Sequence, residues 1–188
     1  IDRSKFDLML IDQRVEPDWE DKLVKELKTG NVVCVALTVM TGEPITFALK
    51  TCRLVKETCD VPTVWGGIHP TILPEQTLEN DLVDIVVRGK GEFILKELVE
   101  TLAENEGLSK VKGISYKAAD RSILHNEDSN AFDADAIPIP PYDIVDIKRY
   151  KRSGFDFQVM SFITSRGCPH NCTFCYITSL SSKERRWQ

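Results

Sequence analysis

Short apolar runs alternate with amphipathic segments over the first two-thirds of the chain. Apolar residues recur at intervals of three and four in three segments, which predicts helices over residues 18–28, 44–58 and 93–103. Between these segments lie short apolar and β-branched runs, which predict strands over residues 8–11, 32–37, 63–65 and 83–87. The run at 32–37 is apolar on both faces, as in a parallel strand that is covered from both sides.

This alternation predicts an α/β fold, namely a doubly wound parallel sheet with right-handed crossovers. Ligands of such sheets bind beyond the carboxyl ends of the strands. The loops expected there supply glycines, hydroxyl groups, a histidine and two charged side chains. The candidate binding residues are Thr38, Met40, Thr41, Gly42, Gly66, Gly67, His69, Gly89, Lys90, Gly91 and Glu92.

The character of the chain changes after about residue 112. Residues 113–116 predict a short edge strand, and a polar, acidic stretch follows. Three prolines within residues 138–141 then predict an extended, semi-rigid connector. We therefore divide the chain into a sheet domain, a linker and the start of a second domain that opens with a strand over residues 158–164. The respective ranges are residues 1–117, 118–157 and 158–188.

Charge and composition narrow the class of protein. With 24 basic and 29 acidic side chains the formal net charge is −5, which argues against a broad nucleic-acid interface. The sequence contains no apolar stretch long enough to span a membrane and nothing that resembles a signal peptide. We therefore expect a cytoplasmic protein, whose thiols stay reduced. Three of its cysteines, Cys34, Cys52 and Cys59, are expected in the core.

The other three cysteines, Cys168, Cys172 and Cys175, lie within eight residues. Three thiolates are one short of the set that closes an ordinary 4Fe–4S cluster, so one iron would stay open to a substrate or cofactor. A zinc site completed by His170 is the main alternative. A disulfide fits poorly because it would leave one cysteine over.

The segment Thr164-Ser165-Arg166-Gly167-Cys168-x₃-Cys172-x-Phe174-Cys175-Tyr176 resembles the signature of the radical S-adenosylmethionine enzymes. The resemblance implies that the three cysteines bind three irons of a 4Fe–4S cluster and that S-adenosylmethionine chelates the fourth. It implies that Phe174 lies near the adenine. An electron from the reduced cluster would then cleave the sulfonium and give a 5′-deoxyadenosyl radical.

Residues 5–117 and 138–142 resemble the cobalamin-binding domain that precedes the catalytic barrel in one class of these enzymes. The resemblance rests on the segments at residues 38–41, 65–71 and 84–92. The resemblance implies that their glycines and hydroxyl groups contact the cobalamin tail. For His69 we expect a turn-stabilising or tail-contacting role rather than ligation of cobalt. A flavodoxin-like domain that binds FMN is the specific competitor.

Two departures from this class stand out. Lys90 occupies a position that is usually acidic, and the Asp-x-His-x-x-Gly segment that ligates cobalt in many cobalamin proteins is not in the chain. That segment would follow the first strand of the class, whereas residues 8–11 align with the second. We therefore expect the natural chain to begin upstream of Ile1, or a substitute strand to fill the gap.

These resemblances predict the N-terminal part of a cobalamin-dependent radical S-adenosylmethionine enzyme that catalyses C-methyl transfer or a radical-driven cyclisation or oxidation. It would need a small-molecule substrate and an electron donor such as flavodoxin or ferredoxin. The 188 residues alone should be inactive, because later barrel strands would complete the site. One alternative is a magnesium-protoporphyrin monomethyl ester cyclase. Another is a non-catalytic cobalamin carrier or sensor with a structural zinc site.

Overall fold

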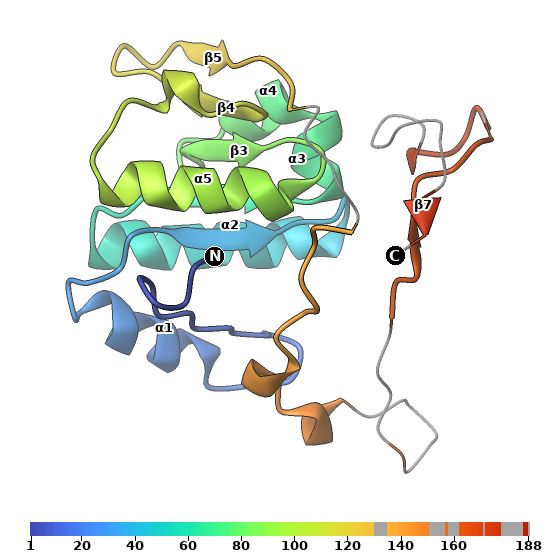
Figure 1. Ribbon diagram of the computed structural model, residues 1–188. Helices are drawn as coiled ribbons and strands as arrows, with labels where there is room; N and C mark the ends of the chain where they lie inside the picture. Colours follow the sequence, from blue (N-terminus) through green and yellow to red (C-terminus); the bar gives the residue numbers. More distant parts are fainter. Residues whose placement is uncertain (130–134, 151–156, 158–161, 171, 178–185, 188) are drawn as a thin grey trace.

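The computed structural model describes residues 1–129, 135–150, 157, 162–170, 172–177 and 186–187 (Figure 1). Its main body is one sheet of five strands in the order β1-β2-β3-β4-β5. The first three strands are parallel, and the last two are antiparallel. The strands are β1 (Val35–Thr38), β2 (Thr63–Gly66), β3 (Ile85–Val87), β4 (Ile114–Lys117) and β5 (Ile123–His125). The predicted parallel α/β arrangement is thus confirmed, with an antiparallel extension that was not predicted.

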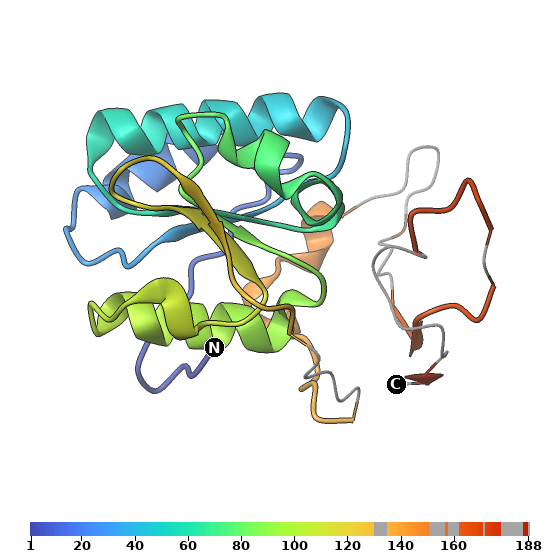
Figure 2. The same ribbon diagram turned by 90° about the horizontal axis from the view of Figure 1, so that it is seen from above.

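Helices cover both faces of this sheet. The helices α1 (Trp19–Leu27) and α2 (Glu43–Thr58) lie on one face and α5 (Gly91–Ala103) lies on the other (Figures 1 and 2). All three were predicted, because each carries a continuous apolar stripe. Two five-residue helices that follow β2 were not predicted: α3 (Ile68–Ile72) and α4 (Pro74–Leu78).

The pleat of the strands divides the core into two layers. On β2, Val64 packs with the cluster that includes Leu98 of α5, whereas its neighbour Trp65 packs with the cluster that includes Cys52 of α2. All three residues of β3 are buried. Successive side chains of a strand point to opposite faces, so strands covered on both faces must be apolar throughout. Because β2 and β3 are held in place by this packing, the points at which the loops after them begin are fixed as well.

Three strand predictions were wrong in detail. The run at 32–37 was expected to be covered on both faces, but β1 begins at Val35 and leaves Ala36 and Thr38 exposed at the end of the sheet. Residues 8–11 form no strand, and Leu8, Met9 and Leu10 are 39%, 56% and 50% exposed. This segment has no ladder partner, since β1 ends the sheet in the described part of the chain. Residues 113–116 were expected at the edge, but β5 pairs outside β4. The strand Ile123–His125 falls in the range predicted as linker, because the hairpin that forms it is short and polar.

The linker is anchored to the N-terminal segment. It contains two 3₁₀ helices, η2 (Tyr142–Ile144) and η3 (Ile147–Arg149); a third, η1 (Leu108–Lys110), follows α5. The Arg3 guanidinium lies 2.8 Å from the Asp143 carboxylate, and the Tyr150 hydroxyl donates to Asp12 Oδ2 at 2.8 Å. These contacts make the described part of the linker a docked element rather than a free spacer.

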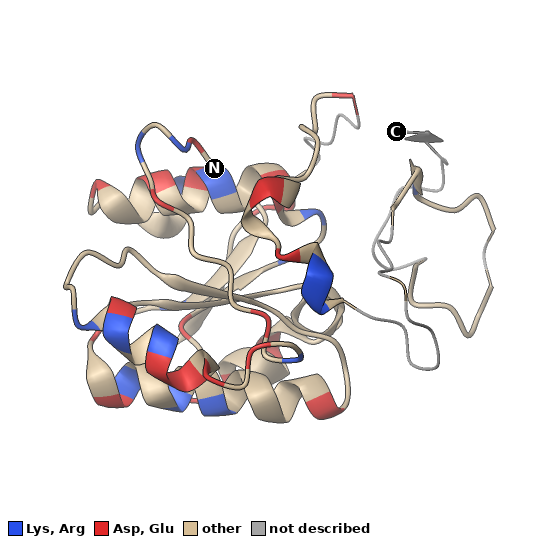
Figure 3. Ribbon diagram, turned by 90° about the horizontal axis from the view of Figure 1, so that it is seen from below, with Lys and Arg blue, Asp and Glu red and all other residues tan. Residues whose placement is uncertain are grey.

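A second, two-stranded antiparallel sheet consists of β6 (Ser165–Arg166) and β7 (Arg186–Trp187). The strand predicted over residues 158–164 falls partly outside the described residues, and residues 162–164 are not in a strand. In the described part of the chain, no helix has the length and apolarity that a membrane span requires. Acidic and basic residues are interspersed along the helices (Figure 3).

Candidate functional site at the carboxyl edge of the sheet

Hydrogen bonds join the three loops that follow the parallel strands. The backbone N–H of His69 donates to Val39 O at 3.1 Å, and the His69 ring Nδ1 lies 3.3 Å from Thr41 Oγ1. Thr71 Oγ1 accepts from Gly89 N–H at 3.0 Å and donates to Gly67 O at 2.7 Å. The loop after β2 is therefore tied to the loop after β1 on one side and to the loop after β3 on the other.

Gly67 is required by close packing as well as by its backbone conformation. Its φ is +97°, and a Cβ atom there would lie 2.9 Å from Val39 O and 3.3 Å from Thr38 Cγ2. No L-residue side chain fits at such distances, so the loops after β1 and β2 can meet only through glycine. At Gly66 a Cβ atom would lie 3.9 Å from its nearest neighbour, Val87 Cβ, which is an ordinary contact.

His69 is the one histidine among the predicted site residues, and it is 7% exposed. Burial lowers the pKa of its imidazole, which favours the neutral ring at pH 7. Its backbone and ring contacts both link loops, as expected for a turn-stabilising role. A role in contacting the cobalamin tail stays a prediction.

The outer surface of the same edge is open. Thr38 at the end of β1 and Met40, Thr41 and Gly42 in the loop that follows it are all accessible, and Met40 is 55% exposed. Gly89 is also exposed, with a φ of +74° that supports a tight turn after β3, whereas Gly91 needs no such conformation. Hydroxyl groups, backbone N–H groups and a thioether thus surround an accessible surface that a large, partly apolar cofactor could cover.

Charged side chains meet at the start of α5. Glu92 lies in the first turn of this helix, where the helix dipole favours a carboxylate. The Arg166 guanidinium lies 2.9 Å from Glu92 Oε1. Arg88 binds Asn126 O and lies 3.1 Å from Asp128. Lys90, which lies between Arg88 and Glu92 in the sequence, is partly exposed. The predicted contact of Glu92 with a cofactor stays a prediction, and in the structure its carboxylate pairs with Arg166 of the segment that carries the cysteines.

None of the three predicted metal ligands is in a disulfide. Cys168 and Cys175 are half-buried, Cys172 is exposed, and Cys175 N–H donates to Cys172 O at 3.1 Å. Three thiols without a disulfide match the donor chemistry of an iron–sulfur cluster. In the ranges that the structure describes, no group of three or more His, Cys, Asp or Glu side chains is arranged to hold a metal ion. Phe174, expected near adenine, is 91% exposed.

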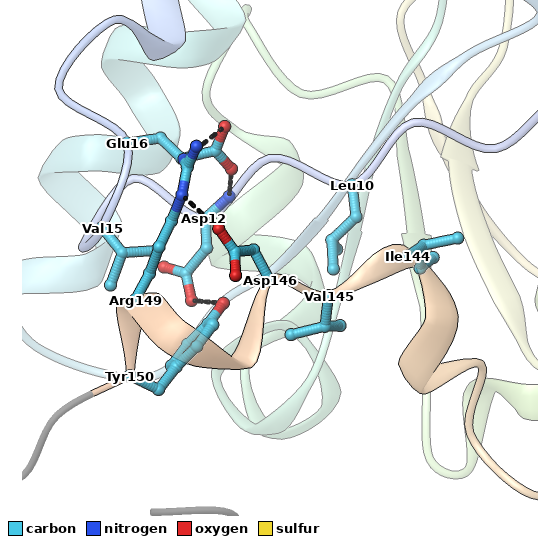
Figure 4. Close-up of a pocket in the computed structure, with 9 residues that line it drawn as sticks. All are labelled: Leu10, Asp12, Val15, Glu16, Ile144, Val145, Asp146, Arg149 and Tyr150. Carbon is cyan, nitrogen blue, oxygen red and sulfur yellow. Dashed lines mark hydrogen bonds and ion pairs between the residues drawn. The ribbon is translucent and has the colours of Figure 1, made fainter. Parts of the chain in front are cut away.

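A cavity lies away from this edge, between the N-terminal segment and the linker (Figure 4). Its volume is about 160 Å³, smaller than the roughly 300–1,000 Å³ of typical ligand sites. Its polar groups already have partners: Asp12 accepts from Tyr150, and Arg149 binds Asp146 at 3.1 Å. We therefore assign this cavity to the docking of the linker.

Sequence reasoning missed two residues of this edge. Thr71 was considered only as part of its loop, although a hydroxyl group shortly after two glycines suggests a cap for a neighbouring turn. Arg166 was considered only as part of the cysteine motif. No sequence signal could pair it with Glu92, because the contact depends on where the cysteine segment lies in space.

Comparison with known protein families identifies the family to which the sheet domain belongs. The family model of the B12 binding domain matches residues 1–99. An uncharacterized methyltransferase of Pyrococcus horikoshii is 35% identical over 192 residues, covering 99% of this chain and 40% of that protein. An anaerobic magnesium-protoporphyrin IX monomethyl ester cyclase of Cereibacter sphaeroides is 32% identical over 176 residues, covering 90% of this chain and 28% of that protein.

Among solved structures, the fold is similar to the cobalamin-dependent S-adenosylmethionine radical enzyme OxsB with aqua-cobalamin bound. The TM-score is 0.71 at 25% identity, over 88% of this chain and 23% of that chain. The chain thus spans less than half the length of each of these proteins. The chain belongs to the B12-binding domain family, and over nearly its whole length it is similar to proteins of the cobalamin-dependent radical S-adenosylmethionine class.

Proposed function

We propose that this chain is the cobalamin-binding and cluster-bearing part of a cobalamin-dependent radical S-adenosylmethionine enzyme that transfers a methyl group to carbon. The observation that carries the proposal is the meeting of two features at one edge of the sheet. Bonded loops of a B12-binding domain lie at the carboxyl ends of β1, β2 and β3, and the strand that leads to Cys168 contacts the same edge through Arg166.

The residues of the sheet edge would bind and orient cobalamin. Accessible Thr38 and Thr41 offer hydroxyl groups, and the turn at Gly89 offers backbone N–H groups to the polar tail. Met40 offers an exposed apolar contact to the edge of the ring. The interlocked loops hold these groups in place before the cofactor arrives, which lowers the entropic cost of binding.

Cys168, Cys172 and Cys175 would hold the cluster through their thiolates. If bound, the cofactors would supply a methyl group and an electron for radical chemistry, and the protein would supply placement and exclusion of water. Phe174, which is exposed in the described chain, offers a ring on which an adenine could stack. We further propose a small-molecule substrate, a flavodoxin- or ferredoxin-type electron donor and a cytoplasmic, reducing location that keeps the thiols free.

Anaerobic reconstitution of the full-length protein with iron and sulfide tests the proposal. We expect about four irons per chain and an electron paramagnetic resonance signal of the reduced cluster that changes on addition of S-adenosylmethionine. We also expect an absorbance change when cobalamin is added to the same sample. Uptake of zinc in place of iron, or indifference to S-adenosylmethionine, would contradict it.

Two other functions remain as competitors. Cyclisation of a magnesium-protoporphyrin monomethyl ester is favoured by the 32% identity to the Cereibacter sphaeroides cyclase, and product analysis with that substrate separates it from methyl transfer. A cobalamin carrier or sensor with a structural zinc site would bind cobalamin but no iron.

A further inference from the structure

We propose that Glu92 and Arg166 are a positioning pair that holds the cysteine loop at the cobalamin-binding edge of the sheet. This inference rests on the proposed function for its purpose, although the contact itself does not. The Arg166 guanidinium lies 2.9 Å from the Glu92 carboxylate, and both side chains are mostly covered, with 31% and 29% exposed. The two residues come from the two parts of the chain that carry the two sets of predicted cofactor ligands.

Glu92 is fixed to the sheet. It is in the first turn of the 13-residue helix α5, whose dipole stabilises a negative charge at that end. The helix in turn packs on the sheet through buried Ile94 and Leu98. The preceding turn at Gly89 is bonded to Thr71 in the neighbouring loop. The carboxylate is therefore a rigid anchor at the carboxyl edge of β3.

Arg166 is fixed close to the first cysteine. Only Gly167 separates it from Cys168, and two residues of extended chain span at most about 7 Å. An anchored guanidinium thus restricts where the Cys168 thiol can lie. Arg166 Nε is buried and has no hydrogen-bond partner among the described residues, so the contact with Glu92 is made by the terminal nitrogen of the guanidinium.

A partly exposed ion pair adds little to global stability, because solvent screens it. Its loss should leave the sheet folded while the cysteine loop gains freedom. Reactions between two bound cofactors depend on their separation, and a displacement of about 1 Å can lower a rate a hundredfold. The pair therefore acts on geometry rather than on folding.

The test compares the full-length protein with its Glu92→Gln, Arg166→Gln and Arg166→Lys variants. Amide hydrogen exchange of residues 165–168 should speed up roughly tenfold in the two neutral variants and much less in Arg166→Lys, which keeps the charge. The double neutral variant should add no further change, since both substitutions remove one contact. In reconstituted samples, the magnetic interaction between cobalt(II) and the reduced cluster should weaken in the neutral variants.

Lys56→Gln is the matched control. Lys56 and Asp84 form a pair at 2.7 Å with similar exposure, 25% and 33%, but at the opposite, amino end of β3. It should leave exchange at residues 165–168 unchanged. Wild-type exchange in Arg166→Gln, or an equal acceleration in Lys56→Gln, would overturn the inference. A wild-type protein that takes up neither iron nor cobalamin would instead overturn the proposed function, and the exchange data would still decide whether the pair holds the loop.

Discussion

The loops at the carboxyl edge of the sheet and the cysteine segment carry the two halves of the proposed site, and they differ in how they are held. Two of the three loops leave strands, β2 and β3, that are buried on both faces, and hydrogen bonds join all three loops. The cysteine segment is attached through two-residue strands and exposes large apolar side chains. Phe162, Ile163 and Phe174 are 68%, 64% and 91% exposed.

From this difference we expect that the fold alone shapes the sheet-edge half of the proposed site, whereas a bound cluster would shape the cysteine half. A preformed pocket edge depends on backbone geometry, so a single added methyl group can damage it. A thiolate loop depends on its metal, because metal binding and local folding are coupled. Substitutions that alter the backbone of the sheet-edge loops should therefore weaken cobalamin binding and leave cluster binding largely unchanged. Loss of a cysteine thiolate should do the reverse.

The largest effect is expected from Cys168→Ala in the full-length protein. Losing one of three thiolates should lower iron from about four per chain to below one, with cobalamin affinity unchanged. Iron analysis and cobalamin titration measure both. Cys59→Ala is the control: this thiol is half-buried beside the cluster of Trp19 and Val55 and should retain the iron. Retention of iron by Cys168→Ala would break the comparison.

Gly67→Ala should produce the next largest effect, on the other half of the site. Its positive φ and the 2.9 Å approach to Val39 O predict a loss of about 2 kcal/mol or more in the free energy of unfolding. Cobalamin should bind at least about tenfold more weakly. Gly66→Ala, one residue earlier, should stay within about 0.5 kcal/mol of wild type. Urea unfolding of both variants measures this difference. Equal losses in the free energy of unfolding would show that the close approach of Gly67 to Val39 O does not cause the destabilisation.

The stabilising contribution of Asp12, which binds Arg14 within the N-terminal segment and Tyr150 of the linker, should depend on pH. The Arg14 guanidinium, with help from the Arg14 amide and the Tyr150 hydroxyl, lowers the pKa of Asp12 to about 2. The pKa of this group is lowered on folding, so its contribution is complete above about pH 4 and is lost as the pH falls towards 2. Asp12→Asn should remove about 1–2 kcal/mol at pH 6 and little at pH 2. A constant difference between the two proteins over this range would refute the assignment.

Thr71→Val should have the smallest effect. It removes the acceptor for Gly89 N–H while keeping the shape of the side chain, which costs about 1 kcal/mol. Cobalamin affinity should fall a few-fold because the loops after β2 and β3 are no longer joined. Thr58→Val, which loses only a hydroxyl bond to Leu54 O within α2, should leave the affinity unchanged. Equal affinities for all three proteins would argue against a joined-loop site.

The sequence correctly predicted those elements whose formation depends on residues close together in the chain. The three long helices and the strands at 63–66 and 85–87 follow from apolar periodicity, and the three binding loops follow from the position of parallel strands. The pairing of β4 and β5, the exposure of residues 8–11 and the Glu92–Arg166 contact depend on neighbours distant in sequence. The cysteine ligands were proposed from their spacing together with the resemblance to a family signature, which indicate donor chemistry but not three-dimensional arrangement.

The central claim is that the sheet edge binds cobalamin and the cysteine segment binds an iron–sulfur cluster. Elemental analysis tests it most directly, on full-length protein that has been reconstituted anaerobically, loaded with cobalamin and freed of excess metal. Two cofactor sites in one chain predict about four iron atoms and one cobalt per polypeptide, with negligible zinc. One zinc with no iron would contradict the assignment of the cysteine segment, and iron without cobalt would contradict that of the sheet edge.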